Sequence, residues 1–343
     1  MSQSVPVFVP TPEDQTNVCM AYLSYVGESL RQQSGTTQTI YNSINEAISK
    51  SPALFNGTDV DWNIVWGPAI CTYPGATEQD SGMFVAQQIS NPDNVVVAIR
   101  GTNGKALEDW WKEDFEVLSM SDWAGVSGAK ISQATQNGID LLLNKLIPDE
   151  GLPAAGQSIT EFLQSLSDKP VNIGFTGHSL GGALSPTLAL WFAERQGQCD
   201  NWDPNSNATI TCTAFAGATA GNAEFANYSN DQFSANPIRR IHNVNDMVPH
   251  AWDKTEMDKI ASLYDGAHID LDWEFKLLLD GIILATKGHH YTQINHSLPV
   301  AFDIDLSQGD SFFTQASYQH YQSYPRIILG DTAGKEFLDV IHK

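Results

Sequence analysis

A strand, a glycine-rich turn and a helix follow one another near the middle of the chain and place a serine between them. Residues 171–176 form an apolar, partly β-branched run that is typical of a buried strand. Gly-His-Ser-Leu-Gly-Gly follows at 177–182, and the apolar pattern after it predicts a helix packed on that strand. The central residue of so sharp a turn is strained, so the residues two before and two after it must lack side chains. Gly177 and Gly181 meet this requirement, and we expect Ser179 to stand on a strand–turn–helix elbow.

This elbow is the setting of a nucleophile. The first N–H groups of the helix would point toward the place where negative charge develops beside the Ser179 hydroxyl. The alternative is a glycine-rich turn that arose by chance, because three fixed positions out of five make a weak motif. The preceding strand, the following helix and the additional Gly182 favour the catalytic interpretation.

The rest of the chain alternates between strand and helix patterns, which predicts an α/β fold: a mostly parallel central sheet with helices on both faces. The run Val-Val-Val-Ala-Ile at 95–99 is typical of a strand covered on both sides. The expected strands are 63–72, 82–89, 94–100, 171–176, 210–216 and 238–245. The expected helices are 17–30, 41–49, 130–146 and 159–166, besides the one that follows Ser179.

Charge and hydropathy narrow the classes of partner. The 343 residues include 40 acidic and 18 basic side chains, a formal charge of −22, which argues against nucleic acid and anionic membrane surfaces. The longest apolar stretches, such as 95–99 and 277–285, are shorter than the ~20 residues that span a bilayer, so we expect no transmembrane segment. The first residues lack the basic start and apolar core of a signal peptide. A cytoplasmic location and a secreted, mature or signal-free form both stay open.

The four cysteines are too few and too scattered for a disulfide framework, and none has metal-ligand spacing. A bridge between Cys199 and Cys212, which flank a polar loop, stays open. We expect no metal and no organic cofactor.

A serine nucleophile needs a base, and the base needs a carboxylate that holds its tautomer. In α/β-hydrolases these groups follow in the order serine, acid, histidine. Asp246 ends the alternating pattern of 238–245, and Pro249 blocks its continuation, so Asp246 is the expected acid. The alternative is a solvated aspartate that forms a turn at the strand end.

The base is sought among the histidines that follow Asp246. His250 is too close in sequence to return onto that carboxylate. His320 lies within the aromatic-rich stretch 312–324, which can enclose an imidazole in a low-dielectric pocket, and it is the expected base. Three other histidines stay open as bases, and for each candidate the alternative is a surface or core histidine bonded to backbone: His289, His290 and His296.

Three further segments accompany the elbow: Ile-Arg-Gly-Thr at 99–102, Gly-Ala-Thr-Ala-Gly-Asn at 217–222, and Asn-Asp-Met-Val-Pro at 245–249. In this order the four motifs resemble the class 3 lipase family over about residues 94–324. The resemblance implies an α/β-hydrolase fold and hydrolysis of carboxylic esters. It also supports His320, since the family's histidine lies near the C-terminus with an aromatic residue shortly after it, here Tyr324.

Because α/β folds often occupy 343 residues as one unit, we expect a single domain over 1–343. The family resemblance places the catalytic core at 94–324, and the N-terminal helices and first strands at 1–90 match the family poorly. It also assigns the oxyanion hole, with one N–H group from Leu180 and a second from Thr102.

A short lid is expected directly after Thr102. Leu107, Trp110, Trp111 and Phe115 would share one face of a helix, with charged residues on the other. In relatives this position holds a lid, which predicts that the apolar face covers Ser179 in water and turns toward lipid at an interface. The alternative is an ordinary helix that faces the core.

The expected activity is therefore that of a triacylglycerol lipase, which acts through an acyl-enzyme on a lipid or other ester at an oil–water interface. A non-lipolytic esterase, a phospholipase or an acyltransferase of the same fold stays open as an alternative. A non-catalytic lipid-binding protein is less favoured, because all three members of a triad have candidates. The oligomeric state is left open.

Overall fold

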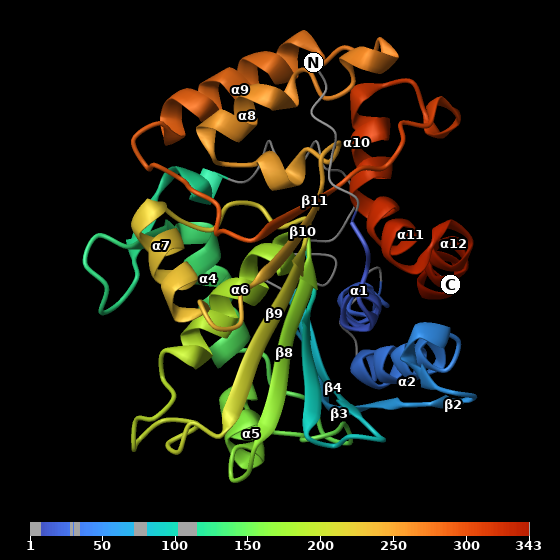
Figure 1. Ribbon diagram of the computed structural model, residues 1–343, viewed down its shortest axis with the longest axis vertical. Coiled ribbons are helices and arrows are strands. Elements are labelled where there is room, and N and C mark those ends of the chain that lie inside the picture. The colour runs from blue at the N-terminus through green and yellow to red at the C-terminus, as the bar shows by residue number, and fades with distance from the viewer. Residues whose placement is uncertain (1–7, 28–29, 31–34, 72–80, 102–114, 343) are drawn as a thin grey trace.

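A seven-stranded sheet runs through the molecule in the order β11-β10-β9-β8-β5-β4-β3 (Figure 1). The computed structural model describes residues 8–27, 30, 35–71, 81–101 and 115–342. β3, β4 and β5 pair antiparallel, and the pairs from β5 to β11 are parallel. The carboxyl ends of β5, β8, β9 and β10 therefore meet at one edge, where an open α/β sheet places its site. The strands are β3 Trp62–Cys71, β4 Ser81–Gln88, β5 Asn94–Ile99, β8 Val171–His178, β9 Ala208–Phe215, β10 Arg239–Asn243 and β11 Ser297–Val300.

Helices cover both faces of this sheet. In β5 the side chains of Val95 and Val97 enter one core, whereas Val96 and Ala98 enter the other, which explains the unbroken apolar run. The first face is covered by α4 Gln133–Asn144, α5 Ile159–Leu166, α6 Leu180–Ala193 and α7 Ala223–Gln232. The second is covered by α1 Pro12–Leu23, α2 Thr36–Ile48, α11 Ser323–Leu329 and α12 Asp331–Ile341.

A third cluster of buried apolar side chains lies beyond the carboxyl end of β10. Figure 1 shows α8 and α9, in orange, across this end of the sheet, with α10 beside them. These elements are α8 Lys254–Ile260, α9 Trp273–Thr286 and α10 Phe312–Tyr321. The remaining short elements are β1 Phe55–Asn56, β2 Asp59–Val60, β6 Met120–Asp122, β7 Lys130–Ser132, η1 Pro52–Leu54, η2 Phe115–Leu118, η3 Val248–His250, η4 Asp265–Ala267 and η5 Leu306–Gln308.

The α/β-hydrolase class is confirmed, and the expected strands are observed with ends shifted by two residues or fewer. Three expected helices differ, and the one expected at 41–49 spans Thr36–Ile48. The helix expected at 130–146 begins only at Gln133, because Lys130–Ser132 pairs with β6 and Ser132 then caps α4 by accepting from the Thr135 N–H (3.0 Å). The first helix spans Pro12–Leu23 rather than 17–30, and Thr11 and Asp14 form a capping box at its start.

The bridge left open between Cys199 and Cys212 is absent. Both thiols are free, since Cys199 is exposed in a loop and Cys212 is buried in β9. Within the residues that the structure describes, no helix is long and apolar enough to cross a membrane. The same part of the chain contains no group of three side chains suited to hold a metal ion.

Candidate active site

Ser179 stands between β8 and α6 with φ 61° and ψ −125°, a strained conformation for a residue with a side chain. Close backbone approaches hold the turn. A Cβ atom on Gly177 would collide with the Gly181 carbonyl, and one on Gly181 would collide with the carbonyl of Ile99 in β5. A Cβ on Gly182 would collide with the Phe215 carbonyl at the end of β9. The glycines therefore let the start of α6 lie directly against the ends of two neighbouring strands.

The backbone of Ser179 is fully engaged in this turn. Its N–H donates to the Phe215 carbonyl (3.1 Å), and its carbonyl accepts from the N–H groups of Gly182 (2.9 Å) and Ala183 (3.2 Å). The residue is buried, with 8% of its surface exposed. Leu180 opens α6, so its N–H has no partner within the helix and lies beside Ser179.

Asp246 and His320 are in contact although 74 residues separate them. His320 Nδ1 lies 2.8 Å from Asp246 Oδ2, and both side chains are fully buried. Asp246 follows β10, where its N–H donates to the Asn243 carbonyl (3.0 Å). His320 lies in the last turn of α10. The end of α10 and the end of β10 thus place the His320 imidazole within hydrogen-bonding distance of the Asp246 carboxylate.

Two further donors fix the Asp246 carboxylate. The Val248 N–H donates to Oδ1 (3.0 Å), and the Tyr324 hydroxyl donates to Oδ2 (2.8 Å). The same hydroxyl accepts from the Asn243 N–H (3.0 Å), so it links the end of β10 to the acid. Burial, and next the charge of Asp246, raise the pKa of Tyr324 well above its usual value, so it stays a donor.

The other ring nitrogen of His320 is available. Nε2 is buried and has no hydrogen-bond partner among the described residues. A neutral imidazole that donates from Nδ1 to a carboxylate carries its lone pair on Nε2. This nitrogen can therefore accept a proton from a hydroxyl, and such bonds often form fully only in the substrate complex.

His178, next to Ser179, contacts the His320 ring. The two ring centroids are 4.5 Å apart with planes 39° from each other. His178 Nε2 donates to the His320 carbonyl (3.0 Å), and the Tyr25 hydroxyl lies 3.0 Å from Nδ1. Burial, followed by the neighbouring His320, lowers the pKa of His178 well below its usual value. His178 is therefore a neutral wall of the site.

The N-terminal segment supplies part of this wall, which sequence analysis did not identify. Tyr22, at the end of α1, donates to the His320 carbonyl (3.4 Å), and its ring lies 4.7 Å from that of His178. Tyr25 lies just beyond α1. No local pattern signals contacts across 142 to 298 residues.

The other candidate bases bind elsewhere. His250 Nδ1 lies 3.0 Å from Glu256 Oε2, and His289 Nε2 donates to the Leu118 carbonyl (2.9 Å). His290 and His296 are exposed. Of the histidines considered as base, His320 is the one in contact with Asp246.

The chain that follows β5 begins beside the nucleophile. A Cβ atom on Gly101 would lie 2.6 Å from the His178 carbonyl oxygen and 3.1 Å from Ser179 Cβ. Thr102, the expected second oxyanion donor, lies outside the described residues. So do the lid candidates Leu107, Trp110 and Trp111 and the side chain of Phe115.

Comparisons with known proteins give consistent results. Residues 96–255 match the family described as Lipase (class 3). The crystal structure of M37 lipase is 32% identical and superposes with a TM-score of 0.85, covering 97% of this chain and 99% of that one.

A triacylglycerol lipase with a serine-protease triad is 20% identical, covers 70% of this chain and 73% of its own, and has a TM-score of 0.46. Rhizomucor miehei lipase in a propeptide complex is 18% identical, and the match covers 73% of this chain and 68% of that one with a TM-score of 0.45. No curated protein sequence matches the chain.

Proposed function

The chain belongs to the class 3 lipase family and is a lipase-type ester hydrolase, and from that premise we propose that it hydrolyses triacylglycerols through Ser179, His320 and Asp246. The observation that carries the proposal is the buried His320–Asp246 pair, whose imidazole has a free ring nitrogen and packs on His178, the residue before the strained Ser179. Such a pair on a nucleophile elbow is the arrangement that activates a hydroxyl.

In the first half-reaction, His320 Nε2 takes the proton of Ser179 while the serine oxygen attacks the ester carbonyl carbon. The tetrahedral intermediate then expels the alcohol, which receives that proton from His320. Water attacks the acyl-enzyme in the same way, again with His320 as base, and releases the fatty acid and Ser179.

Asp246 stabilises the imidazolium that forms in each half-reaction and keeps the Nδ1 hydrogen in place. Tyr324 and Val248 hold the carboxylate, and His178 packs against the imidazole, so these three act as positioning residues. The Leu180 N–H at the start of α6 would stabilise the oxyanion, together with Thr102 as the family resemblance implies. Loss of one such donor typically costs about 3 kcal/mol of transition-state stabilisation.

The surface of α9 supports action on an insoluble lipid. Trp273, Leu277 and Leu284 are 67%, 62% and 74% exposed. At 100° per residue these positions fall on one side of the helix. α9 also lies across the end of the sheet that carries Asp246 (Figure 1). We propose that this face contacts the lipid phase while Ser179 acts.

The triad is tested with a p-nitrophenyl ester series and emulsified tributyrin. We expect Ser179→Ala and His320→Ala to lower kcat by about 10⁴-fold or more with both substrates. Activity retained in either variant, with folding checked by circular dichroism, removes that residue from its role. Preference for emulsified tributyrin and long-chain p-nitrophenyl esters would support a lipase, and preference for short soluble esters would favour an esterase.

The α9 surface is tested with Leu277→Ser and Leu284→Ser. These variants should lose activity on emulsified tributyrin but keep wild-type rates on soluble p-nitrophenyl acetate. Ile89→Ser is the matched control, because Ile89 is 55% exposed just after β4, which ends at the opposite edge of the sheet. Equal losses in the control and the α9 variants would contradict a role of this face.

A further inference from the structure

Arg240 of β10 has a buried guanidinium that lacks partners for two of its three nitrogens. The residue is 9% exposed, and Nη2 donates to Ser297 Oγ (2.8 Å). Nε and Nη1 are buried and have no hydrogen-bond partner in the described part of the chain. Buried cations are normally paired, because an isolated charge in a low-dielectric interior is costly.

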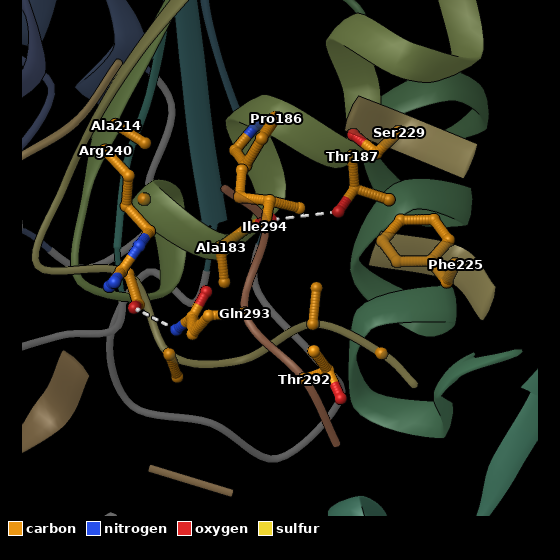
Figure 2. A pocket seen from close by; sticks show the side chains of 15 residues that line it. Ala183, Pro186, Thr187, Ala214, Phe225, Ser229, Arg240, Thr292, Gln293 and Ile294 are labelled. Atoms are coloured by element: carbon orange, nitrogen blue, oxygen red, sulfur yellow. Dashed lines mark hydrogen bonds between the residues drawn. The ribbon is translucent and has the colours of Figure 1, made fainter. Parts of the chain in front are cut away.

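Arg240 lines a small cavity at the start of α6, and the side chain of Gln293 lines the same cavity (Figure 2). The cavity also touches Gly182 and Ala183 at the start of α6, and its volume is about 20 Å³. A space of this size accommodates about one water-sized particle, which is also the size of a monatomic anion. Gln293 Nε2 donates one hydrogen to the Gly217 carbonyl (3.2 Å), and its second N–H can donate to a ligand in the cavity.

Within the described residues, no carboxylate is hydrogen-bonded to Arg240, although the nearby charges of Glu256 and Asp253 favour its charged form. Ser297 Oγ lies 3.1 Å from His242 Nδ1. Burial, and secondly the positive charge of Arg240, lower the pKa of His242 to about 3. His242 is therefore neutral. Burial also lowers the pKa of Arg240 to about 10, so the guanidinium keeps its charge at neutral pH.

Arg240 also lines an open groove at the surface. It is lined by Arg240, His250 and Lys259, and its acidic side chain is Glu256. Glu256 is already engaged, since His250 Nδ1 lies 3.0 Å and Lys259 Nζ 2.5 Å from its carboxylate oxygens. Arg240 is thus a lining residue of both the small cavity and the open groove.

We propose that the cavity at Arg240 binds a single small monovalent anion, of which chloride is the common example. Its ligands are Arg240 Nε and Nη1, with the free N–H of Gln293. A water molecule fits the same space, but it does not balance the buried charge. The apolar wall from Ala183, Pro186 and Phe225 gives a water few polar partners.

The direct test is a crystal structure of the wild-type protein grown in sodium bromide, with data collected at the bromine edge. We expect an anomalous peak within hydrogen-bonding distance of Arg240 Nε or Nη1. Bromide peaks at the surface with none in this cavity would overturn the proposal and leave a hydrated arginine instead.

A second test measures the melting temperature against chloride at constant ionic strength, with gluconate as the replacing anion because it is too large for the cavity. At about 100 times Kd, chloride multiplies the folding constant about 100-fold and should raise Tm by on the order of 5 °C. Arg240→Gln should lose this response, whereas Lys259→Gln, which removes an exposed cation of the groove, should keep it. An unchanged response in Arg240→Gln refutes the site, and if that variant does not fold, the bromide experiment decides.

Discussion

Tyr324→Phe tests whether the Asp246 carboxylate depends on its second layer of donors. The change removes one oxygen from a fully buried ring, with no change of the ring itself. That oxygen donates to Asp246 Oδ2 (2.8 Å) and accepts from the Asn243 N–H (3.0 Å). The variant therefore loses a bond to a charged group and leaves a buried backbone N–H without a partner.

The magnitude follows from these two losses. A hydrogen bond to a charged group is worth about 1.5–3 kcal/mol, and an unsatisfied buried donor costs about 1–3 kcal/mol. Since one hydroxyl serves both bonds and the site can relax, we expect the free energy of unfolding to fall by about 2–4 kcal/mol. The His320–Asp246 bond stays in place, so kcat should fall by no more than about 10-fold, or about 1.4 kcal/mol.

The assay is urea unfolding followed by fluorescence, together with kcat and KM on a soluble p-nitrophenyl ester. Tyr318→Phe is the matched control, because the Tyr318 hydroxyl accepts from Arg326 (2.9 Å), which also pairs with Asp331. This control should lose less stability and keep its kcat. A Tyr324→Phe variant as stable and as active as Tyr318→Phe would refute the reasoning.

Two other predictions concern the elbow and the buried histidines. Gly181→Ala should abolish activity and cost more than about 3 kcal/mol, because its Cβ collides with backbone. Gly281→Ala, in α9 with nothing within 4 Å of its Cβ, should instead stabilise by up to about 1 kcal/mol in the same unfolding assay. His178 and His242 have pKa values lowered by burial, so below about pH 6.5 they take up protons only on unfolding. The free energy of unfolding should therefore decrease as the pH is lowered, and each of the two histidines contributes a slope of about 1.4 kcal/mol per pH unit. A His242→Gln variant with the wild-type slope between pH 6 and 4 would disprove this.

The sequence by itself determined the local features of this protein. The glycines at 177, 181 and 182 predict the elbow, since only residues without a Cβ atom fit where α6 meets β5 and β9. Apolar periodicity located the main strands and the α/β class, because each strand carries its own burial pattern. Family motifs within 94–324 pointed to a class 3 lipase, which the comparisons confirm. A single domain over 1–343 stays a prediction.

Tertiary structure alone decided which distant groups meet. Motif order and an aromatic neighbourhood made His320 the expected base, but only packing of α10 against the end of β10 puts its Nδ1 on Asp246. No local sequence pattern signals the contacts of Tyr22 and Tyr25 with the site. The same is true of Arg240 Nε and Nη1, which have no hydrogen-bond partner among the described residues. The physical reason is that backbone sterics and periodic burial act over a few residues, whereas hydrogen-bond partners and buried charges depend on segments brought together from the whole chain.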